Sequence, residues 1–262
     1  MGEVDRRYGL VRDALTEHGL DALVVAGSEY TGFEGAVRYL SGFQIVHRYA
    51  YVLVPLEGDP SIVFPAEARY VGEHGDSWIE DQVFIDHPGS WLAGKLAGKR
   101  VGLYGGDYVM QARDFAALQG EVDLVPFDEQ FDLARAVKSD AELESVRDSV
   151  RINTEGFHAF HEAYAPGRTA AEVLAPAEKL FVEEGCGRLT MNMVLTGPEF
   201  AIARDDFCGF NEARLAVYGD HERQRAGLVL LLVVFGTIPV GAAITAFGGV
   251  DQRSHRGAGY AL

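Results

Sequence analysis

The chain has 262 residues, of which 48% are hydrophobic and 24% charged, which is typical of globular proteins and excludes a disordered, collagen-like or multi-span membrane protein. It carries 23 Lys and Arg against 39 Asp and Glu, a formal net charge of -16 at pH 7. Because this charge repels phosphate backbones and anionic lipids, we expect no nucleic-acid partner, and a membrane surface is disfavoured.

Cysteine content and the start of the chain bear on its compartment. The two cysteines, Cys186 and Cys208, form no Cys-x-x-Cys pair. Neither a disulfide framework nor a thiolate zinc site is therefore expected, and a reducing cytoplasm is the simplest location. The first seven residues lack a basic end followed by an apolar run, so we expect no signal peptide.

The first 126 residues alternate helix and strand patterns. Apolar residues recur at helical spacing from Val4 to Leu15, and Gly19 stands where a C-cap would end that helix. The apolar run at 22–26 is typical of a strand buried on both faces. Further strands are predicted at 51–54, 61–64, 82–85, 101–104 and 122–125, with a hairpin connection at 57–60 and a helix at 110–118. The pattern predicts an α/β domain with a mixed sheet and flanking helices.

After residue 126 the sequence becomes helical. Residues 139–142 (Ser-Asp-Ala-Glu) and 169–172 (Thr-Ala-Ala-Glu) are capping boxes, each opening a helix. We expect the second helix to reach Glu184 and to be kinked by Pro176. A strand is predicted at 191–195.

The last part of the chain is ambiguous. From Leu228 to Phe247 there are twenty residues without a charge, a length that could just cross a bilayer. Glycine and proline interrupt this run, so two buried strands at 228–235 and 240–247 are favoured over a membrane span.

Five segments, in order and at matching spacing, resemble one protein family. Three lie at 19–25, 37–43 and 54–60, with the sequences GLDALVV, VRYLSGF and VPLEGDP. Two more lie at 133–143 and 166–173, with the sequences LARAVKSDAEL and PGRTAAEV. Together they resemble the creatinase, prolidase and aminopeptidase P superfamily of pita-bread metallopeptidases.

The resemblance implies a domain organisation. A creatinase/prolidase-like N-terminal domain would occupy 1–126, a linker 127–138, the start of an α+β pita-bread catalytic domain 139–203, and an atypical tail 204–262. In that family the N-terminal domain helps to shape the substrate pocket and the dimer. The catalytic domain holds two metal ions, which activate water to hydrolyse a bond next to proline. Carboxylate and imidazole ligands suit a pair of Mn, Co or Zn ions.

The ligand set that the resemblance requires is absent from this sequence. It consists of an Asp, a second Asp eleven positions later, a His and two Glu. Asp205, Asp206, Asp220 and Asp251 have only Ala, Val or Leu at that later position, and no Glu follows Glu222. We therefore expect no metal or other cofactor in this chain, and we assign no catalytic, cofactor-binding or metal-ligating residue.

Two functional hypotheses follow. The first is an Xaa-Pro peptidase family protein that is inactive as this chain, either a truncated relative or one whose tail after residue 203 is unrelated sequence. The second is a non-catalytic binding or dimerisation module built on the N-terminal domain. In both, we expect a homo-oligomer or a hetero-oligomer with a complete paralogue. Helices at 139–184 without their full sheet would leave apolar surface that promotes association.

Other side-chain groups favour structural interpretations. His158 and His161 are spaced to share a metal, and Asp205-Asp206 is a carboxylate pair, but a solvated surface explains each. The sequence at 104–107 (Tyr-Gly-Gly-Asp) lacks a phosphate-loop pattern and predicts a turn with Asp107 as the N-cap of a helix. For the remaining candidates, packing is as good an explanation as ligand contact or catalysis: Arg38-Tyr39, Ser41, His47-Arg48-Tyr49 and Cys186.

Overall fold

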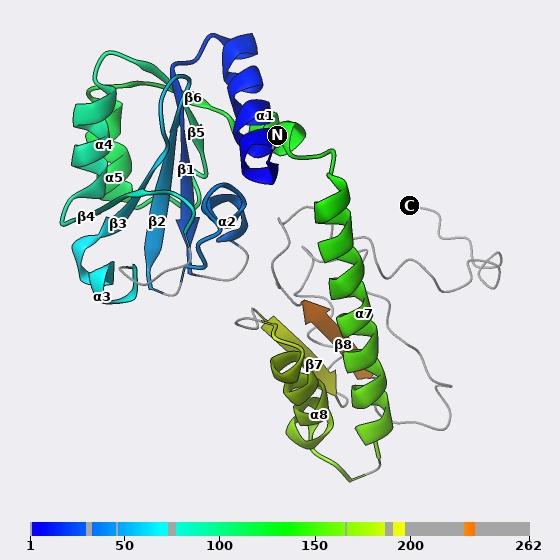
Figure 1. The fold of residues 1–262 in the computed structure, drawn as a ribbon. Helices are drawn as coiled ribbons and strands as arrows, with labels where there is room; N and C mark the ends of the chain where they lie inside the picture. Colours follow the sequence, from blue (N-terminus) through cyan, green and yellow to red (C-terminus); the bar gives the residue numbers. More distant parts are fainter. Residues whose placement is uncertain are drawn as a thin grey trace, which may run out of the picture. The chain divides into compact units, whose positions relative to one another are not determined.

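A computed structural model describes residues 2–29, 33–45, 47–72, 77–165, 167–186, 191–196 and 228–233 (Figure 1). The chain divides into two compact units, the first reaching Ser145 and the second beginning at Val146. We describe each unit by itself.

The first unit is built on a six-stranded sheet. Its strands are β1 (Ala22–Ser28), β2 (Tyr49–Pro55), β3 (Ser61–Pro65), β4 (Asp81–Ile85), β5 (Arg100–Tyr104) and β6 (Asp123–Pro126). They lie in the order β4-β3-β2-β1-β5-β6. β2 is antiparallel to both of its neighbours, and the other pairs are parallel. The predicted mixed sheet, its six strands and the hairpin between β2 and β3 are confirmed.

Helices cover both faces of this sheet, as the apolar run in β1 predicts. Leu23 and Val25 pack on the side of α1 (Glu3–His18), α2 (Gly35–Ser41) and α6 (Asp128–Ala134). Val24 points the other way, toward α4 (Pro88–Leu96) and α5 (Ala112–Gln119), because successive side chains of a strand alternate in direction. Figure 1 shows α1 and α2 on one side of the sheet and α4 and α5 on the other.

In the first unit, the predicted helices α1 and α5 are confirmed, and the structure adds shorter helices that were not predicted. α1 ends at Gly19, whose φ of 61° is the left-handed C-cap conformation that favours glycine. The predicted helix at 110–118 is α5. The sequence pattern did not reveal α2, α4 or α6, which have only seven to nine residues each. α6 lies in the segment assigned to a linker, and its Phe131 is buried in the first unit. The short η1 (Ala66–Ala68) and α3 (Arg69–Gly72) follow β3.

A buried carboxylate ties α5 to α4 and to the sheet. Asp114 is 2% exposed, and its carboxylate accepts hydrogen bonds from the Tyr51 hydroxyl at 2.9 Å and from the Gly89 amide at 3.1 Å. Gly89 lies in the first turn of α4, where helix amides have no partner within the helix. A Cβ at Gly89 would lie 2.3 Å from the Asp114 Cα, so the close approach of α4 and α5 requires glycine there.

The start of α7 (Asp140–Ala163) is held by a second buried carboxylate. Glu142 accepts a hydrogen bond from Arg6 at 2.7 Å, and Arg7 lies 3.2 Å from its other oxygen. The predicted capping box is confirmed, since Glu142 also accepts from the Ser139 amide and its own amide donates to the Ser139 hydroxyl. These contacts attach the first turn of α7 to α1 within the first unit.

The second unit contains the rest of α7, α8 (Ala170–Glu183) and an antiparallel pair of strands, β7 (Met191–Thr196) and β8 (Leu228–Val233). The predicted capping box of α8 is confirmed, and Pro176 lies inside that helix. Phe160 of α7 packs with Phe181 of α8, for which Gly156 makes room.

The ambiguous part of the chain is described only in part. β8 falls within the strand predicted at 228–235, whereas the strand predicted at 240–247 lies outside the described residues. Among the helices that the described residues form, none is both long and apolar enough to cross a lipid bilayer.

Replacing Asp114 with Ala should lower the free energy of unfolding by about 2–4 kcal/mol, because it leaves the Tyr51 hydroxyl and the Gly89 amide without their buried acceptor. Urea unfolding measures this loss. The matched control is Asp107→Ala, at an exposed aspartate, which should change stability by less than about 0.5 kcal/mol. Equal effects of the two substitutions would contradict the assigned role of Asp114.

Tyr51→Phe should change the response to alkaline pH. Burial, with a smaller contribution from Asp114, raises the pKa of Tyr51 above that of an unfolded tyrosine, about 10. Tyr51 therefore stabilises the fold below pH ~10, and this contribution is lost as the pH rises and the unfolded chain ionises first. The variant should lose about 1–2 kcal/mol at pH 7 and show a shallower decline above pH 10. An unchanged slope in pH-dependent unfolding would contradict this.

Candidate functional site

The strand directions bring the loops with polar side chains to one edge of the first sheet. β1, β3, β4, β5 and β6 all point the same way, so their carboxyl ends share this edge, and β2 begins there. In open α/β sheets, ligands bind outside the carboxyl ends of the strands. The carboxyl edge is therefore the candidate functional site.

Arg48, at the start of β2, has an unusual backbone at this edge. Its φ is 57°, and it is the only non-glycine residue with a positive φ among those described. Its carbonyl accepts hydrogen bonds from the Glu29 amide at 2.9 Å and the Ser28 hydroxyl at 3.2 Å. These bonds hold Arg48 in a conformation that costs about 1–2 kcal/mol for a residue with a Cβ, and such conformations concentrate at functional sites.

The Arg48 side chain offers a cation at the surface. Its guanidinium pairs with Glu67, which follows β3, and both side chains are 45% exposed. The guanidinium also lies over the Tyr49 ring, 5.5 Å from the ring centroid. An incoming anion would compete with the exposed carboxylate of Glu67 for this guanidinium. Glu67 is a weak competitor, because exposed ion pairs stabilise a protein by at most about 1 kcal/mol.

Exposed aromatic rings lie on loops at the same edge. Phe33 after β1 contacts Tyr108 after β5, with ring centroids 5.8 Å apart, and His47 contacts Tyr70 at 5.7 Å. Phe33, Tyr70 and Tyr108 are each more than one-third exposed. Exposed rings of this kind provide apolar contact area with little loss of side-chain entropy on binding.

Tyr104, the last residue of β5, and Tyr108, in the loop after it, act as neutral hydrogen-bonding groups. The Tyr108 hydroxyl donates to Asp128 at 3.0 Å, and the Tyr104 hydroxyl accepts from Arg135 at 3.1 Å. Burial is the main cause that raises the pKa of each tyrosine, and nearby Asp128 adds to it. Both hydroxyls therefore keep their protons at neutral pH.

The turn after β5 corrects one sequence prediction. Residues 104–107 do form a turn, in which the amides of Val109 and Met110 donate to the Gly105 carbonyl. Asp107 is not the N-cap, however, because α5 begins at Ala112 and its N-cap is Gln111. The turn extends four residues further than predicted, and Met110 is buried in the core beside α5.

The other singled-out residues have ordinary structural roles. Ser41 is buried and donates to the Val37 carbonyl at 2.7 Å. The Tyr39 ring lies under the Arg7 guanidinium, 4.6 Å from the ring centroid. Burial lowers the pKa of Arg38, and the nearby Glu34 carboxylate opposes this shift. The sequence singles out Arg48 only as one of several candidate residues, because a positive φ at a non-glycine position has no recognisable sequence pattern.

Residues of the second unit show no assembled site. His158 and His161 are exposed on α7. Cys186 packs against the α7–α8 core, and burial raises the pKa of its thiol, which disfavours the nucleophilic thiolate. Asp205 and Asp206 lie outside the described residues. Across the described ranges, no three His, Cys, Asp or Glu side chains come together in a way that could hold a metal ion.

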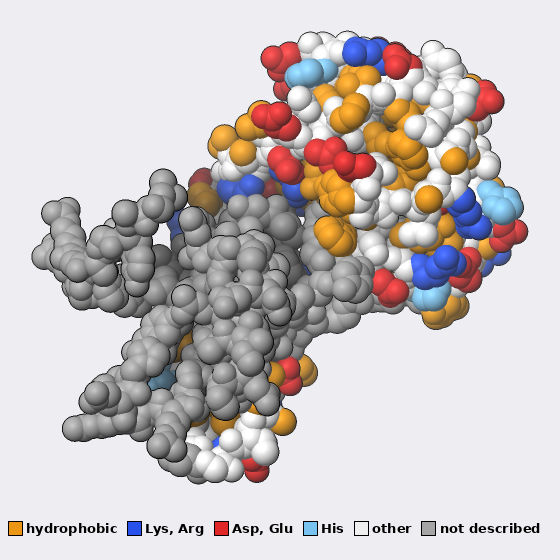
Figure 2. All heavy atoms as spheres, turned by 180° about the vertical axis from the view of Figure 1, so that it is seen from behind, with side chains coloured by type: hydrophobic (Ala, Val, Ile, Leu, Met, Phe, Trp, Pro, Cys, Tyr) orange, Lys and Arg blue, Asp and Glu red, His pale blue; other side chains and the backbone are white. Residues whose placement is uncertain are grey.

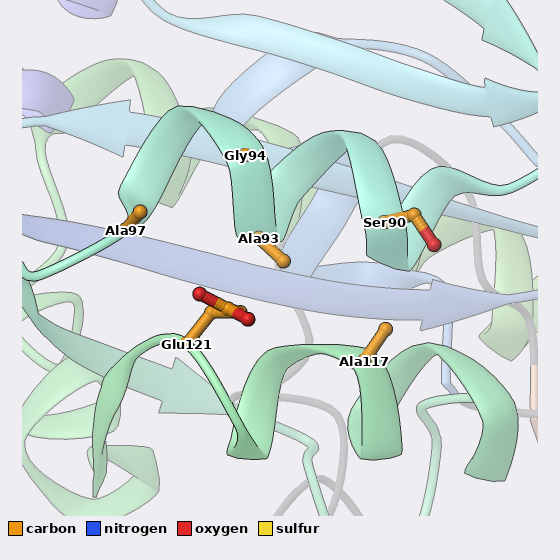
Figure 3. Close-up of a pocket in the computed structure, with 6 residues that line it drawn as sticks. All are labelled: Ser90, Ala93, Gly94, Ala97, Ala117 and Glu121. Carbon is orange, nitrogen blue, oxygen red and sulfur yellow. The ribbon is translucent and has the colours of Figure 1, made fainter.

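A shallow depression lies between α4 and α5, away from the carboxyl edge (Figure 3). Its volume is about 340 Å³, and it is lined by Ser90, Ala93, Gly94, Ala97, Ala117 and Glu121. Figure 3 shows Glu121 and Ser90 toward opposite ends of the depression. Small side chains with one carboxylate provide little chemistry, so this depression is not a candidate active site.

The visible surface of the first unit combines apolar and charged areas. Figure 2 shows hydrophobic side chains gathering toward the middle of one face, with many charged side chains around them. Apolar contact area is therefore exposed on this face.

The sheet order and the helices on both faces define an α/β domain, and comparisons with known proteins identify its family. The family model of the creatinase/prolidase N-terminal domain matches residues 7–137, half of the chain. The chain belongs to this family. No curated protein matches the chain.

Solved structures share the fold. A prolidase from Thermococcus sibiricus is 19% identical, with a TM-score of 0.59 over 76% of this chain and 55% of that one. A prolidase from Pyrococcus horikoshii is 17% identical, with a TM-score of 0.57 over 73% and 52%. The dipeptidase PepE from Mycobacterium ulcerans is 22% identical, with a TM-score of 0.56 over 74% and 53%. The chain thus spans about half the length of these structures.

The strain at Arg48 can be measured with a matched pair of variants. Arg48→Gly and Arg48→Ala remove the same ion pair, but only glycine adopts a positive φ without cost. Arg48→Gly should therefore be about 1 kcal/mol more stable than Arg48→Ala in urea unfolding. A glycine variant no more stable than the alanine variant would show that the backbone there is unstrained.

Proposed function

We propose that these 262 residues form a prolidase-like protein that recognises a ligand at the carboxyl edge of its N-terminal domain but does not hydrolyse peptides by itself. Membership of the creatinase/prolidase N-terminal family supports the ancestry. The observation that carries the proposal is the contrast between a complete N-terminal fold and a sequence without the Asp/Asp/His/Glu/Glu set.

A Mn, Co or Zn pair does not fit the side chains that the structure describes. Hard divalent ions need several carboxylate or imidazole ligands directed at one point. His158 and His161 belong to one exposed helix face, and the described residues supply no group of three potential ligands. We therefore derive no hydrolytic step for this chain.

The carboxyl edge has the side chains for binding. The Arg48 guanidinium is paired with one exposed carboxylate, that of Glu67. A ligand carboxylate can replace Glu67 in this ion pair. Phe33 and Tyr108 supply apolar ring surface on loops at the same edge, and the Tyr104 hydroxyl is a neutral polar group. A small peptide with an apolar side chain and a free carboxylate matches this combination.

The alternative is a non-catalytic binding or dimerisation module. The self-contained core of the first unit favours it, since helices cover both faces of the sheet. Such a domain can keep its fold whether or not a catalytic centre exists elsewhere. The partner would be a second copy or a complete paralogue.

Calorimetry on the purified, chelator-stripped chain tests the main proposal. Titrated Mn or Co should bind weakly and no better than Ca, which controls for nonspecific binding to a chain of net charge -16. An Xaa-Pro dipeptide such as Ala-Pro should remain uncleaved when Mn is present. Two tight Mn or Co sites accompanied by dipeptide hydrolysis would refute the proposal.

A further inference from the structure

A carboxylate holds the exposed rings at the end of β5. Asp128, the first residue of α6, accepts two hydrogen bonds at its Oδ1 atom, from the Gly105 amide at 2.9 Å and from the Tyr108 hydroxyl at 3.0 Å. Tyr108 in turn contacts Phe33, with ring centroids 5.8 Å apart. Asp128 therefore fixes the loop after β5 at two points. We call Phe33, Tyr108 and Asp128 the ring–carboxylate cluster.

The second oxygen of the Asp128 carboxylate is available to a ligand. Within the described ranges no donor reaches Oδ2, and the protein does not enclose this atom. The neighbouring rings are accessible as well, since Phe33 is 38% exposed and Tyr108 is 50% exposed. A carboxylate next to exposed aromatic rings suits an ammonium group, which donates charge-assisted hydrogen bonds and is attracted to the ring faces.

The strand register gives the distance from this cluster to Arg48. β2 and β5 lie on opposite sides of β1, so two strand spacings, about 10 Å, separate them. The register pairs Tyr49 with Ser28 and Tyr104 with Val25. The start of β2 therefore lies three residues, about 10 Å, further along β1 than the end of β5. Combining the two offsets places the Arg48 backbone about 14 Å from the end of β5.

We propose that the ring–carboxylate cluster binds the amino terminus of a peptide whose carboxylate is held by Arg48, and that this ligand has about four residues. The inference rests on the proposed function and specifies its ligand. An extended peptide spans at most about 3.3–3.6 Å per residue, so four residues cover about 14 Å and two cover about 7 Å. A dipeptide therefore reaches one of the two groups but not both.

The charges at the carboxyl edge match a peptide with two free ends. Arg48 is an exposed cation before β2, and Asp128 is a carboxylate that bonds the amide following β5. A peptide that lies across β1 with its ammonium group at Asp128 and its carboxylate at Arg48 meets an opposite charge at each end. Its first side chain then lies near the rings of Phe33 and Tyr108, which provide apolar contact.

Calorimetry of the full chain with synthetic peptides tests the two ends separately. Ala-Pro-Ala-Ala should bind about tenfold more tightly than Ala-Pro, because only the longer peptide reaches both groups. N-acetylation removes the ammonium group and should weaken binding of the tetrapeptide about tenfold, and amidation of its carboxylate should do the same through Arg48. Absence of binding by every peptide would overturn the proposed function and this inference together. Sensitivity to amidation but not to N-acetylation would overturn this inference alone.

Asp128→Asn assigns the effect of N-acetylation to one side chain. Asparagine keeps an oxygen that accepts from Gly105 and Tyr108 but carries no charge, so the variant should fold and bind the free and N-acetylated tetrapeptides equally. Glu129→Gln, at the exposed next position of α6, serves as the control and should keep the tenfold difference. Melting temperatures check that both variants fold. If Asp128→Asn still prefers the free amino terminus, or Glu129→Gln loses this preference, Asp128 does not bind the ammonium group.

Discussion

Burial of β1 on both faces is the constraint on which the first unit depends. Every residue from Ala22 to Ala26 is at most 1% exposed, so the sheet requires helices above and below it. With both faces covered, exposed polar groups are left to the strand ends, and the shared direction of five strands brings five carboxyl ends to one edge. The position of Arg48, Tyr104 and Tyr108 is therefore a consequence of how β1 is buried.

Two buried carboxylates then fix the helices that cover this sheet. Asp114 accepts from the α4 backbone and from a tyrosine of β2, while Glu142 lies between Arg6 and Arg7 of α1. A buried carboxylate is costly unless it is paired, so each helix is held in the one placement that satisfies it. Apolar packing brings the layers together, and these polar contacts select their orientation.

Apolar runs and capping boxes predicted most of this fold. The strands, α1, α5 and both capping boxes leave local signals, because burial and caps depend on residues near each other in sequence. α2, α4 and α6 were not predicted because they have at most nine residues and contain glycine or adjoin proline. The candidate site was predicted less well, since the φ of Arg48 and the meeting of Phe33 with Tyr108 depend on strand order rather than on local sequence.

The carboxylates of the first unit serve its own fold. Its carboxylates are used internally: Asp114 holds α4, Glu142 holds α7, and Asp128 accepts from the Gly105 amide and from Tyr108. Each of these contacts joins residues of the first unit, so its own side chains hold this core together. The first unit can therefore keep its fold independently of the chemistry that the rest of a longer relative carries, because a fold does not by itself imply a function.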